Sequence, residues 1–489
     1  MEGTRTDIIE NIGRWTTDLT APNILWLKGH PGVGKSTIAT DVVERLNATK
    51  RLGSNFFFRR QNAAVMTPNA LWRTVACDLA RNYSTVQRTL VAKLKAGDVD
   101  PASANAEKLF RHLIHDPLIR CDDVPVTKLP VVVIDALDEC GGLDGQYSGR
   151  RKNLLKTLAN WSRLPRKFKL IVTSREENDI ERLFSKTPHH PIKIMSGQMV
   201  DEQSSDDICM FLTDRLQDIA TQYPRSLSPD WPGADIIEEL AEKAAGLFIW
   251  AETVVKFVAL GEPQQQLRQV FDGGEAGDMA ALYRQILGMG FRDPNEEVVK
   301  NFHSVVGAII LAKAPLSFSA LVQLLSKEGS SVEHICNGLQ SVLDSKSTLE
   351  FHHQSFVDFL LDQKKCPTIF LIDQARERRN LTLSVLRAMK NSLRFNICCL
   401  ESSYSRNIDI QDLPSRETEY IPLHVSYSCW WWSSHLRETE FDLEIFVTIQ
   451  YFMRDQFLWW LEVMSITKRV SQCSSMLLLL VDWIQVSFI

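Results

Sequence analysis

The stretch Gly29-His30-Pro31-Gly32-Val33-Gly34-Lys35-Ser36 decides the fold of this 489-residue chain. It fits the pattern G-x-x-x-x-G-K-[ST] at every defined position. Such a loop needs glycines because successive backbone N–H groups must curl around a polyphosphate without side chains colliding with it. An apolar run, Ile24–Leu27, precedes the loop, and a helical stretch, Thr37–Leu46, follows it. The sequence therefore predicts a strand, a phosphate-binding loop and a helix, in that order.

The side chains at the end of this loop predict how a nucleotide is held. Lys35 is expected to bring a positive charge to the β- and γ-phosphates, and the Ser36 hydroxyl can ligate Mg²⁺. Thr37 belongs to the same predicted nucleotide site, because the helix that begins there turns its positive end toward the anion. The alternative is a glycine-rich turn that matches the pattern by accident, and the flanking strand and helix disfavour it.

A second apolar run, Val131–Ile134, ends in Asp135. Open α/β sheets bind ligands at the carboxyl ends of their strands, so Asp135 is a candidate Mg²⁺ ligand beside Ser36. Asp138 and Glu139 follow within one turn, and we expect at least one of them to orient the attacking water. The alternative for both is a solvated loop.

A third apolar run, Leu170–Val172, leads into Thr173, Ser174 and Arg175. A guanidinium suits phosphate oxygens, so Arg175 is expected to sense the γ-phosphate from within the chain. The alternative is an arginine that merely pairs with a surface carboxylate. The carboxylates after Asp135 favour an NTPase with its own catalytic glutamate over a kinase that depends on a second substrate.

Composition narrows the class of protein. Hydrophobic residues make up 44% and charged residues 24%, as in ordinary globular proteins. The net charge of −5 gives nucleic-acid binding no support, and no apolar run approaches the roughly 20 residues that a membrane span needs. The start of the chain does not resemble a signal peptide, and the ten cysteines have no metal or redox spacing. A soluble, cytoplasmic protein is expected.

The order of the segments predicts an α/β domain followed by helices. Up to about residue 195, short apolar runs alternate with helical stretches, which predicts a parallel sheet with helices on both faces. Beyond residue 200 the pattern becomes helical, with N-cap candidates at residues 204–207. Residues 300–365 are compatible with a small helical or winged-helix module. Six of the twelve tryptophans lie in the last sixty residues, in a helical arm.

These motifs together resemble the NACHT-type NTPases of the STAND class, and specifically their fungal, nephrocystin-like branch. The resemblance covers essentially the whole chain. It is carried by the phosphate loop and by the segments Gly3-Thr4-Arg5 with Trp15, Leu52–Phe58, Asp135–Cys140, Thr173–Arg175, Gly246–Ala251 and His353–Leu360. One departure is Phe248, which stands where related switches often carry a proline that contacts adenine.

The resemblance implies an architecture of consecutive modules. These are a lead-in (1–20), a P-loop nucleotide domain (21–198), a helical lid (199–298), a winged helix (299–370) and a C-terminal helical arm that stops before any repeats (371–489). In that family the lid and the winged helix clamp ADP. By resemblance, His353 of the winged helix reaches the β-phosphate.

The resemblance also implies a function. ATP, with Mg²⁺, would replace ADP, open the clamp and drive assembly into a homo-oligomer, and GTP stays open as an alternative nucleotide. Partners would engage through N- and C-terminal regions, here expected to be missing, in signalling for self/non-self recognition or innate immunity. Two other readings stay open: a nucleotide-binding scaffold that does not cycle, and a metabolic P-loop kinase.

Overall fold

The computed structural model describes residues 4–101, 103, 105–125, 128–271, 275–402 and 404–486. Gly3 of the expected lead-in lies outside these residues. The chain divides into two compact units, Met1–Leu282 and Tyr283–Ile489. Each unit is built around its own buried residues.

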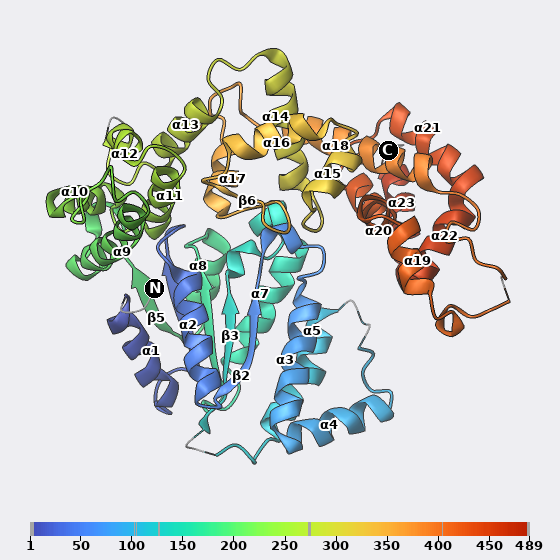
Figure 1. The fold of residues 1–489 in the computed structure, drawn as a ribbon. Coiled ribbons are helices and arrows are strands. Elements are labelled where there is room, and N and C mark those ends of the chain that lie inside the picture. The colour runs from blue at the N-terminus through green and yellow to red at the C-terminus, as the bar shows by residue number, and fades with distance from the viewer. Residues whose placement is uncertain are drawn as a thin grey trace. The chain divides into compact units, whose positions relative to one another are not determined.

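The first unit contains a five-stranded parallel sheet in the order β2-β3-β4-β1-β5 (Figure 1). Every apolar run that predicted a strand forms one. The strands are β1 (Ile24–Gly29), β2 (Leu52–Phe57), β3 (Val131–Asp135), β4 (Lys169–Ser174) and β5 (His190–Ile194). β1, β3 and β4 read as continuous apolar runs because both faces of the sheet are buried.

Alternating residues of each strand face opposite layers of helices. Leu25 and Leu27 pack in one cluster with buried residues of helices α1 (Thr6–Thr17) and α2 (Lys35–Ala48). Their neighbours Ile24 and Trp26 pack in the other cluster. The helices contributing to that second cluster are α3 (Pro68–Asn82), α4 (Ser84–Lys95), α5 (Ala106–Leu109), α6 (Asp116–Ile119), α7 (Gly149–Trp161) and α8 (Asn178–Phe184). This is the predicted three-layer α/β architecture.

The parallel register brings the ends of the central strands to one edge. Lys28 of β1 lies beside Ser174 of β4, and Ile134 of β3 lies beside Val172 of β4. The phosphate loop after β1, Asp135 of β3 and Arg175 after β4 therefore meet at the same edge of the sheet. This is why motifs more than a hundred residues apart can form one site.

The helices predicted to form a lid follow the sheet within the first unit, and they are called the lid helices below. They are α9 (Glu202–Gln222), α10 (Ala234–Ala244), α11 (Phe248–Ala259) and α12 (Pro263–Phe271), and α13 (Met279–Gly290) crosses the division between the units. The N-cap prediction for α9 is wrong. The cap is Asp201, whose carboxylate accepts the Ser204 backbone N–H at 2.7 Å. Residues 204–207 lie inside the helix, where Ser204 and Asp207 serve a long-range contact described below.

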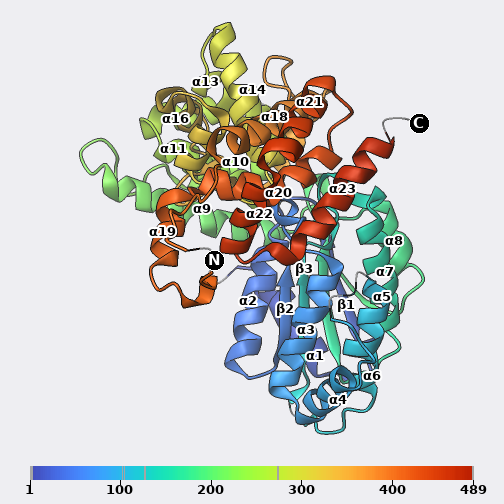
Figure 2. The same cartoon turned by 90° about the vertical axis from the view of Figure 1, so that its right-hand side faces the viewer.

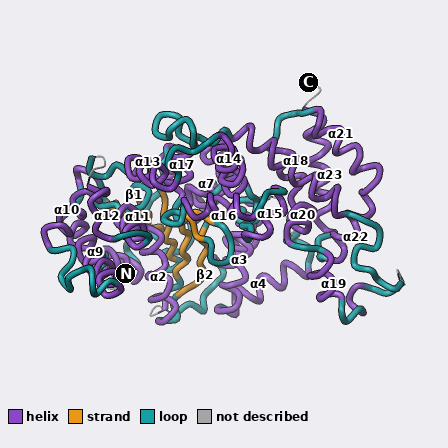
Figure 3. The backbone as a smooth tube through the Cα atoms, turned by 45° about the horizontal axis from the view of Figure 1, so that its top comes forward, coloured by secondary structure: helices purple, strands orange, loops and turns teal. Residues whose placement is uncertain are grey.

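The second unit is mostly helical (Figure 3). Its first part places α14, α15 and α16 before the antiparallel pair β6–β7, the order of a winged helix. The elements are α14 (Glu296–Leu311), α15 (Phe318–Leu325), α16 (Gly329–Gly338), β6 (Leu343–Asp344), β7 (Glu350–Phe351), α17 (Gln354–Leu360), α18 (Gln374–Ser392), α19 (Leu413–Tyr420), α20 (Leu423–Arg437), α21 (Leu443–Tyr451), α22 (Phe457–Ile466) and α23 (Cys473–Val486).

Tryptophans build much of the interior of the C-terminal helices. Trp432 and Trp460 are fully buried, with ring centroids 6.0 Å apart in an edge-on arrangement. The Trp460 indole N–H donates to the Cys429 carbonyl at 3.0 Å, and the Trp483 indole N–H donates to the Thr439 carbonyl at 2.7 Å. α20, which carries Trp432, packs against α18, α22 and α23 (Figure 2). The tryptophan-rich end is therefore a packed helical arm, as predicted.

Among the helices of the described residues, none combines the length and the apolar character needed to cross a bilayer.

Candidate functional site

The phosphate loop has the backbone of an anion cradle. Gly32 and Gly34 adopt φ angles of 83° and 93°, in the left-handed region that favours glycine. Gly34 is the N-cap of α2, so the positive end of this helix opens onto the loop. The Lys35 ammonium donates to the carbonyl oxygens of Gly29 and His30, both at 2.8 Å, and so lies at the mouth of the loop.

Asp135 lies beside Ser36, as the predicted metal pair requires. Ser36 is near enough to act on the Asp135 carboxylate and to favour its charged form, and the Thr173 hydroxyl donates to the same carboxylate at 2.5 Å. Burial raises the pKa of Asp135. The described residues hold no group of three or more His, Cys, Asp or Glu side chains that could bind a metal by themselves. A hydroxyl and one carboxylate fit Mg²⁺, which keeps waters and takes its other ligands from phosphates.

The backbone after Asp135 is held in an unusual conformation. Ala136 has φ 53°, and its N–H donates to the Thr173 hydroxyl at 2.9 Å. Thr173 thus ties the ends of β3 and β4 together and orients Asp135. A left-handed non-glycine residue costs about 1 kcal/mol or more and persists where its surroundings determine it.

Asp138 and Arg175 form an ion pair at the same edge. The Arg175 Nε lies 3.2 Å from one Asp138 oxygen, and the Arg175 backbone N–H donates to the other at 3.0 Å. Asp138 is almost fully buried. The carboxylate of Asp138 therefore positions Arg175, which leaves Glu139 as the better placed of the two acidic residues to act on water.

Glu139 lies in a setting that tunes an acid toward neutrality. Its carboxylate accepts the Arg60 backbone N–H at 2.9 Å. Burial, and then the Asp138 charge, raise the pKa of Glu139 to about 7. A carboxylate with a pKa near the working pH suits general base catalysis.

Lys35 experiences the opposite shift. Burial lowers the pKa of Lys35 to about 8, while the Asp138 charge acts to raise it and the Arg175 charge acts to lower it. A bound phosphate would add negative charge beside the ammonium and favour its charged form. A bound phosphate would therefore stabilise the ammonium form of Lys35, which burial disfavours.

The lid helix α11 contacts the phosphate loop directly. The Ile249 backbone N–H, in the first turn of α11, donates to the Gly32 carbonyl at 3.1 Å. A methyl group added at Gly32 would lie 2.0 Å from the Ile249 Cγ2 atom, so no other residue fits there without moving α11. The lid and the loop therefore share one backbone hydrogen bond and one tight contact.

Arg5 joins the lead-in, the loop and two lid helices. Its backbone N–H donates to Asp207 of α9 at 3.0 Å, and its guanidinium donates to the Ser204 hydroxyl. The guanidinium also donates to the Val33 carbonyl at 3.3 Å and lies 5.1 Å from the centre of the Phe248 ring. The Arg5 and Asp207 side chains are only 5% and 3% exposed, so this ion pair is buried.

A small recess opens beside the start of α2. It is lined by Thr4, Arg5, Ile9, Gly34, Thr37, Ile38, Asp41 and Phe248. Phe248, which replaces the proline expected from the resemblance, forms part of this lining. Thr37 of the predicted nucleotide site lies here, next to the lead-in.

His353 lies in the second unit, as the N-cap of α17. Its Nδ1 accepts the Ser355 backbone N–H at 3.1 Å and lies 2.7 Å from the Ser355 hydroxyl. This is the structural role that the residue has in the described chain. Its predicted contact with a β-phosphate stays a prediction.

Sequence reasoning did not predict the contacts of several residues at the site. Thr173 and Arg60 act through hydrogen bonds to the two carboxylates, and Arg5 and Ile249 reach the loop from distant segments. Thr173 follows a predicted strand and could have been found by its position at the sheet edge. The other three depend on tertiary packing.

Comparison with known proteins shows what the chain is similar to. Residues 3–175 match the family model described as nephrocystin 3, N-terminal. The chain is also 24% identical, over 494 aligned residues, to the vegetative incompatibility protein HET-E-1 of Podospora anserina. That match covers 92% of this chain, whereas the chain spans about a third of the length of HET-E-1, 34%.

Solved structures give more distant likenesses. A STAND-class signal transduction ATPase with a tetratricopeptide repeat sensor, from Pyrococcus horikoshii, has a TM-score of 0.41 at 11% identity, over 95% of this chain and 64% of that one. A Walker-type ATPase of Pyrococcus abyssi has a TM-score of 0.35 at 14% identity, over 72% of this chain and 94% of that one. The phosphate loop, the carboxylate at the end of β3 and the nephrocystin-type match over residues 3–175 support the resemblance of the chain to NACHT-type P-loop NTPases of the STAND class.

Proposed function

We propose that the chain is a nucleotide-dependent signalling switch that binds ATP or ADP with Mg²⁺ and hydrolyses ATP slowly. The loop amides of residues 29–37 and the Lys35 ammonium would hold the phosphates, and Ser36 and Asp135 would hold the metal. Their positions at one sheet edge fit this role. The bound metal would neutralise phosphate charge. GTP would use the same loop, so the preference for ATP is part of the proposal.

Hydrolysis would depend on Glu139 and Arg175. Glu139, with its pKa raised to about 7, would accept a proton from the attacking water. Arg175 would meet the γ-phosphate, with Asp138 as its positioning partner through the ion pair at 3.2 Å. Glu139 and Asp138 follow β3 and Arg175 follows the neighbouring β4, as expected of a site at the carboxyl edge of a parallel sheet.

The observation that carries the switch is the contact between α11 and the phosphate loop. Ile249 bonds Gly32 in the middle of the loop that would hold the phosphates. A nucleotide can move a lid only by binding the open and closed arrangements with different affinity. Because Lys35 and the loop amides would bind ADP and ATP alike, Arg175 is the proposed discriminator in this unit, and His353 is the proposed discriminator from the second.

The wider role extends the proposal. HET-E-1 is a vegetative incompatibility protein, and we take recognition between self and non-self as the role of this chain as well. ATP binding would lead to a homo-oligomer, with protein partners bound through further regions. All ten cysteines are free, which supports a reducing compartment such as the cytoplasm.

The test is nucleotide binding and turnover by the full chain. The protein should release bound ADP on denaturation, bind ADP and ATP when emptied, and hydrolyse ATP slowly without any acceptor. Lys35→Ala should abolish binding, whereas Lys95→Ala, an exposed lysine at the end of α4, should not. Binding without hydrolysis would favour a scaffold, and hydrolysis that requires a small acceptor would favour a kinase. A folded Lys35→Ala protein that binds ATP as tightly as the parent would refute the site.

A further inference from the structure

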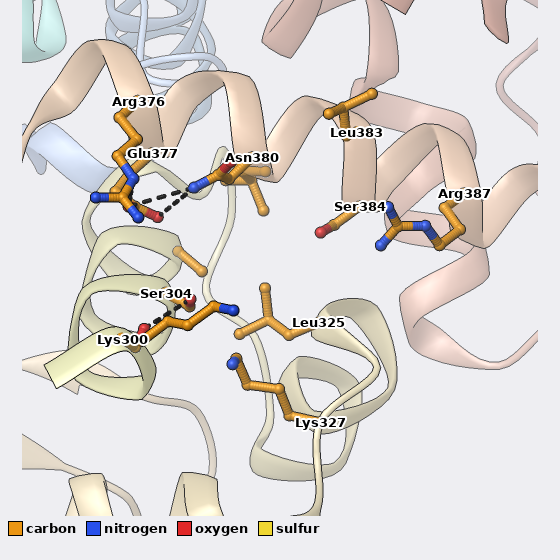
Figure 4. A pocket seen from close by; sticks show the side chains of 12 residues that line it. Lys300, Ser304, Leu325, Lys327, Arg376, Glu377, Asn380, Leu383, Ser384 and Arg387 are labelled. Carbon is orange, nitrogen blue, oxygen red and sulfur yellow. Dashed lines mark hydrogen bonds and ion pairs between the residues drawn. The ribbon is translucent and has the colours of Figure 1, made fainter. Parts of the chain in front are cut away.

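A cavity of about 450 Å³ opens in the second unit between α14, the turn after α15 and α18 (Figure 4). Its volume falls within the range of small-molecule sites. The lining residues are Lys300, Ser304, Ala308, Leu325, Lys327, Arg376, Glu377, Asn380, Leu381, Leu383, Ser384 and Arg387. None of them belongs to the nucleotide domain.

Helical periodicity explains why these side chains converge. Lys300, Ser304 and Ala308 are spaced by four residues and so lie along one face of α14. Arg376 and Arg387 of α18 are eleven residues apart, which is three turns, so they also share a face. Figure 4 shows these two arginines at opposite ends of the cavity, with Lys300 and Lys327 facing them across it.

The lining is strongly positive. It contains four cationic side chains and a single carboxylate, that of Glu377. Glu377 is 4% exposed and packs against Gly307, where a methyl group would lie 2.8 Å from the Glu377 Cγ atom. The Glu377 carboxylate accepts a hydrogen bond from the Asn380 amide at 3.3 Å and lies 3.8 Å from the Arg376 Nε, so it already has partners within the lining.

Two of the cations lack a counter-charge. Within the described part of the chain, no carboxylate lies within 4.0 Å of the Lys300 ammonium or the Arg387 guanidinium. Lys327 donates to the Asn301 side-chain oxygen at 2.6 Å, which is a neutral partner. Burial, and then the Lys300 charge, lower the pKa of Lys327, while the Glu377 and Glu297 charges act to raise it. The lowering prevails, so the cavity disfavours the positive charge of Lys327. An anion would relieve this repulsion.

The ordinary alternative is a solvated basic surface, since exposed lysines and arginines are common. Cations on such a surface usually spread apart or pair with acidic residues. Here cations from three segments surround one concavity, and its one carboxylate is held by the helix packing. The two ends of the α18 face are roughly 16 Å apart at the backbone, so a single phosphate cannot reach both arginines.

We propose that this cavity binds a small polyanion with several phosphate groups, held between Arg376 and Arg387 of α18 and Lys300 and Lys327 opposite. Arg387 and Arg376 can each grip one phosphate with two N–H groups, while the lysines act as point charges. The Ser304 and Ser384 hydroxyls and the Asn380 amide add hydrogen-bonding groups. The site is independent of the nucleotide site, so neither proposal depends on the other.

Tripolyphosphate is the probe, titrated calorimetrically into the full chain saturated with ADP and Mg²⁺ so that the phosphate loop is occupied. The full chain carrying Lys35→Ala repeats the titration as a second way to silence that loop. We expect saturable binding that weakens with added salt, raises the melting temperature, and exceeds binding of inorganic phosphate by about tenfold or more.

The variant Lys327→Gln with Arg387→Gln should weaken tripolyphosphate binding by about tenfold or more. Arg394→Gln, an exposed arginine just beyond α18 and outside the cavity, is the matched control and should bind as the parent does. Lys300→Glu, at an exposed position, serves as a second variant if the double variant unfolds. The proposal fails if tripolyphosphate does not saturate the ADP-bound protein, if it binds no better than phosphate, or if Arg394→Gln weakens binding as much as the double variant.

Discussion

Arg5→Ala should loosen the lid from the phosphate loop. Arg5 lies in the lead-in, before α1, and its side chain contacts the loop at Val33 and the lid at Ser204, Asp207 and Phe248. If the closed lid retains the nucleotide, loss of this side chain should speed nucleotide release. The backbone N–H of residue 5 would still donate to Asp207, so only the side-chain contacts are lost.

The structure sets the size of the effect. A buried hydrogen bond from a charged group contributes about 1.5–3 kcal/mol, and a desolvated cation–π contact about 0.5–2 kcal/mol. Part of the loss comes from leaving the buried Asp207 carboxylate without its counter-charge. A loss of about 2–4 kcal/mol in the closed arrangement corresponds to release that is roughly 30 to 700 times faster.

The assay is release of a fluorescent ADP analogue, chased with unlabelled ADP. Arg45→Ala is the control, because Arg45 is 65% exposed in α2 and pairs with Asp41 of the same helix, a contact worth under about 1 kcal/mol. The side-chain contacts by which Arg5 joins the lid to the phosphate loop are called the latch. Because Arg5 also lines the recess beside α2, Asp207→Asn tests the latch without altering that recess. The effect of Arg5→Ala combined with Asp207→Asn on the release rate, expressed as a free energy, should be smaller than the sum of the two single effects by about 1 kcal/mol or more. Unchanged release in both Arg5→Ala and Asp207→Asn would refute the latch.

Three further predictions concern the phosphate loop, the proposed general base Glu139 and the C-terminal helical arm. Gly32→Ala should displace α11 and increase proteolysis of the lid. Gly34→Ala should not, because Gly34 has a similar positive φ but an added methyl group would find its nearest contact at 4.0 Å. Equal proteolysis of the two variants would contradict the tight contact between Gly32 and Ile249. The pKa of Glu139 is about 7 in the folded chain and about 4.5 in the unfolded chain, so the folded chain binds this proton more tightly. The free energy of unfolding should therefore fall as the pH rises from about 4.5 to 7, by on the order of 3 kcal/mol at most. Glu139→Gln should remove that slope in chemical unfolding and abolish hydrolysis, and a parental slope would argue against the raised pKa. Trp460→Phe should destabilise the second unit by about 1 kcal/mol more than Trp432→Phe. The reason is that Trp460 loses its hydrogen bond to the Cys429 carbonyl, whereas the Trp432 indole N–H has no partner among the described residues. Urea unfolding that ranks the two variants the other way would contradict this prediction.

Local sequence rules predicted the sheet and the phosphate loop because their signals are local. The strands are apolar runs of a few residues, and the loop needs glycine at Gly32 and Gly34 for its backbone alone. Asp135 and Arg175 could be placed at one edge because parallel strands bring their carboxyl ends together. The predicted module boundaries, including the one at residue 370/371, stay predictions.

The contacts that join the lid to the loop could not be predicted in this way. Ser204 and Asp207 looked like helix caps because they precede an apolar run, yet both lie inside α9 and contact Arg5, about two hundred residues away. Likewise, Ile249 lies in the first turn of α11, and nothing local shows that its N–H meets Gly32. Pairings of this kind depend on how the helices pack.

The backbone amide of Ile249 reports most directly on the central claim that nucleotide state controls the lid. Hydrogen exchange at residues 248–259 should be measured in the full chain with saturating ADP and with a non-hydrolysable ATP analogue, both with Mg²⁺. We predict strong protection of the Ile249 amide with ADP, where it bonds the Gly32 carbonyl, and faster exchange with the ATP analogue. Equal protection in the two nucleotides, with both bound to saturation, would contradict the switch.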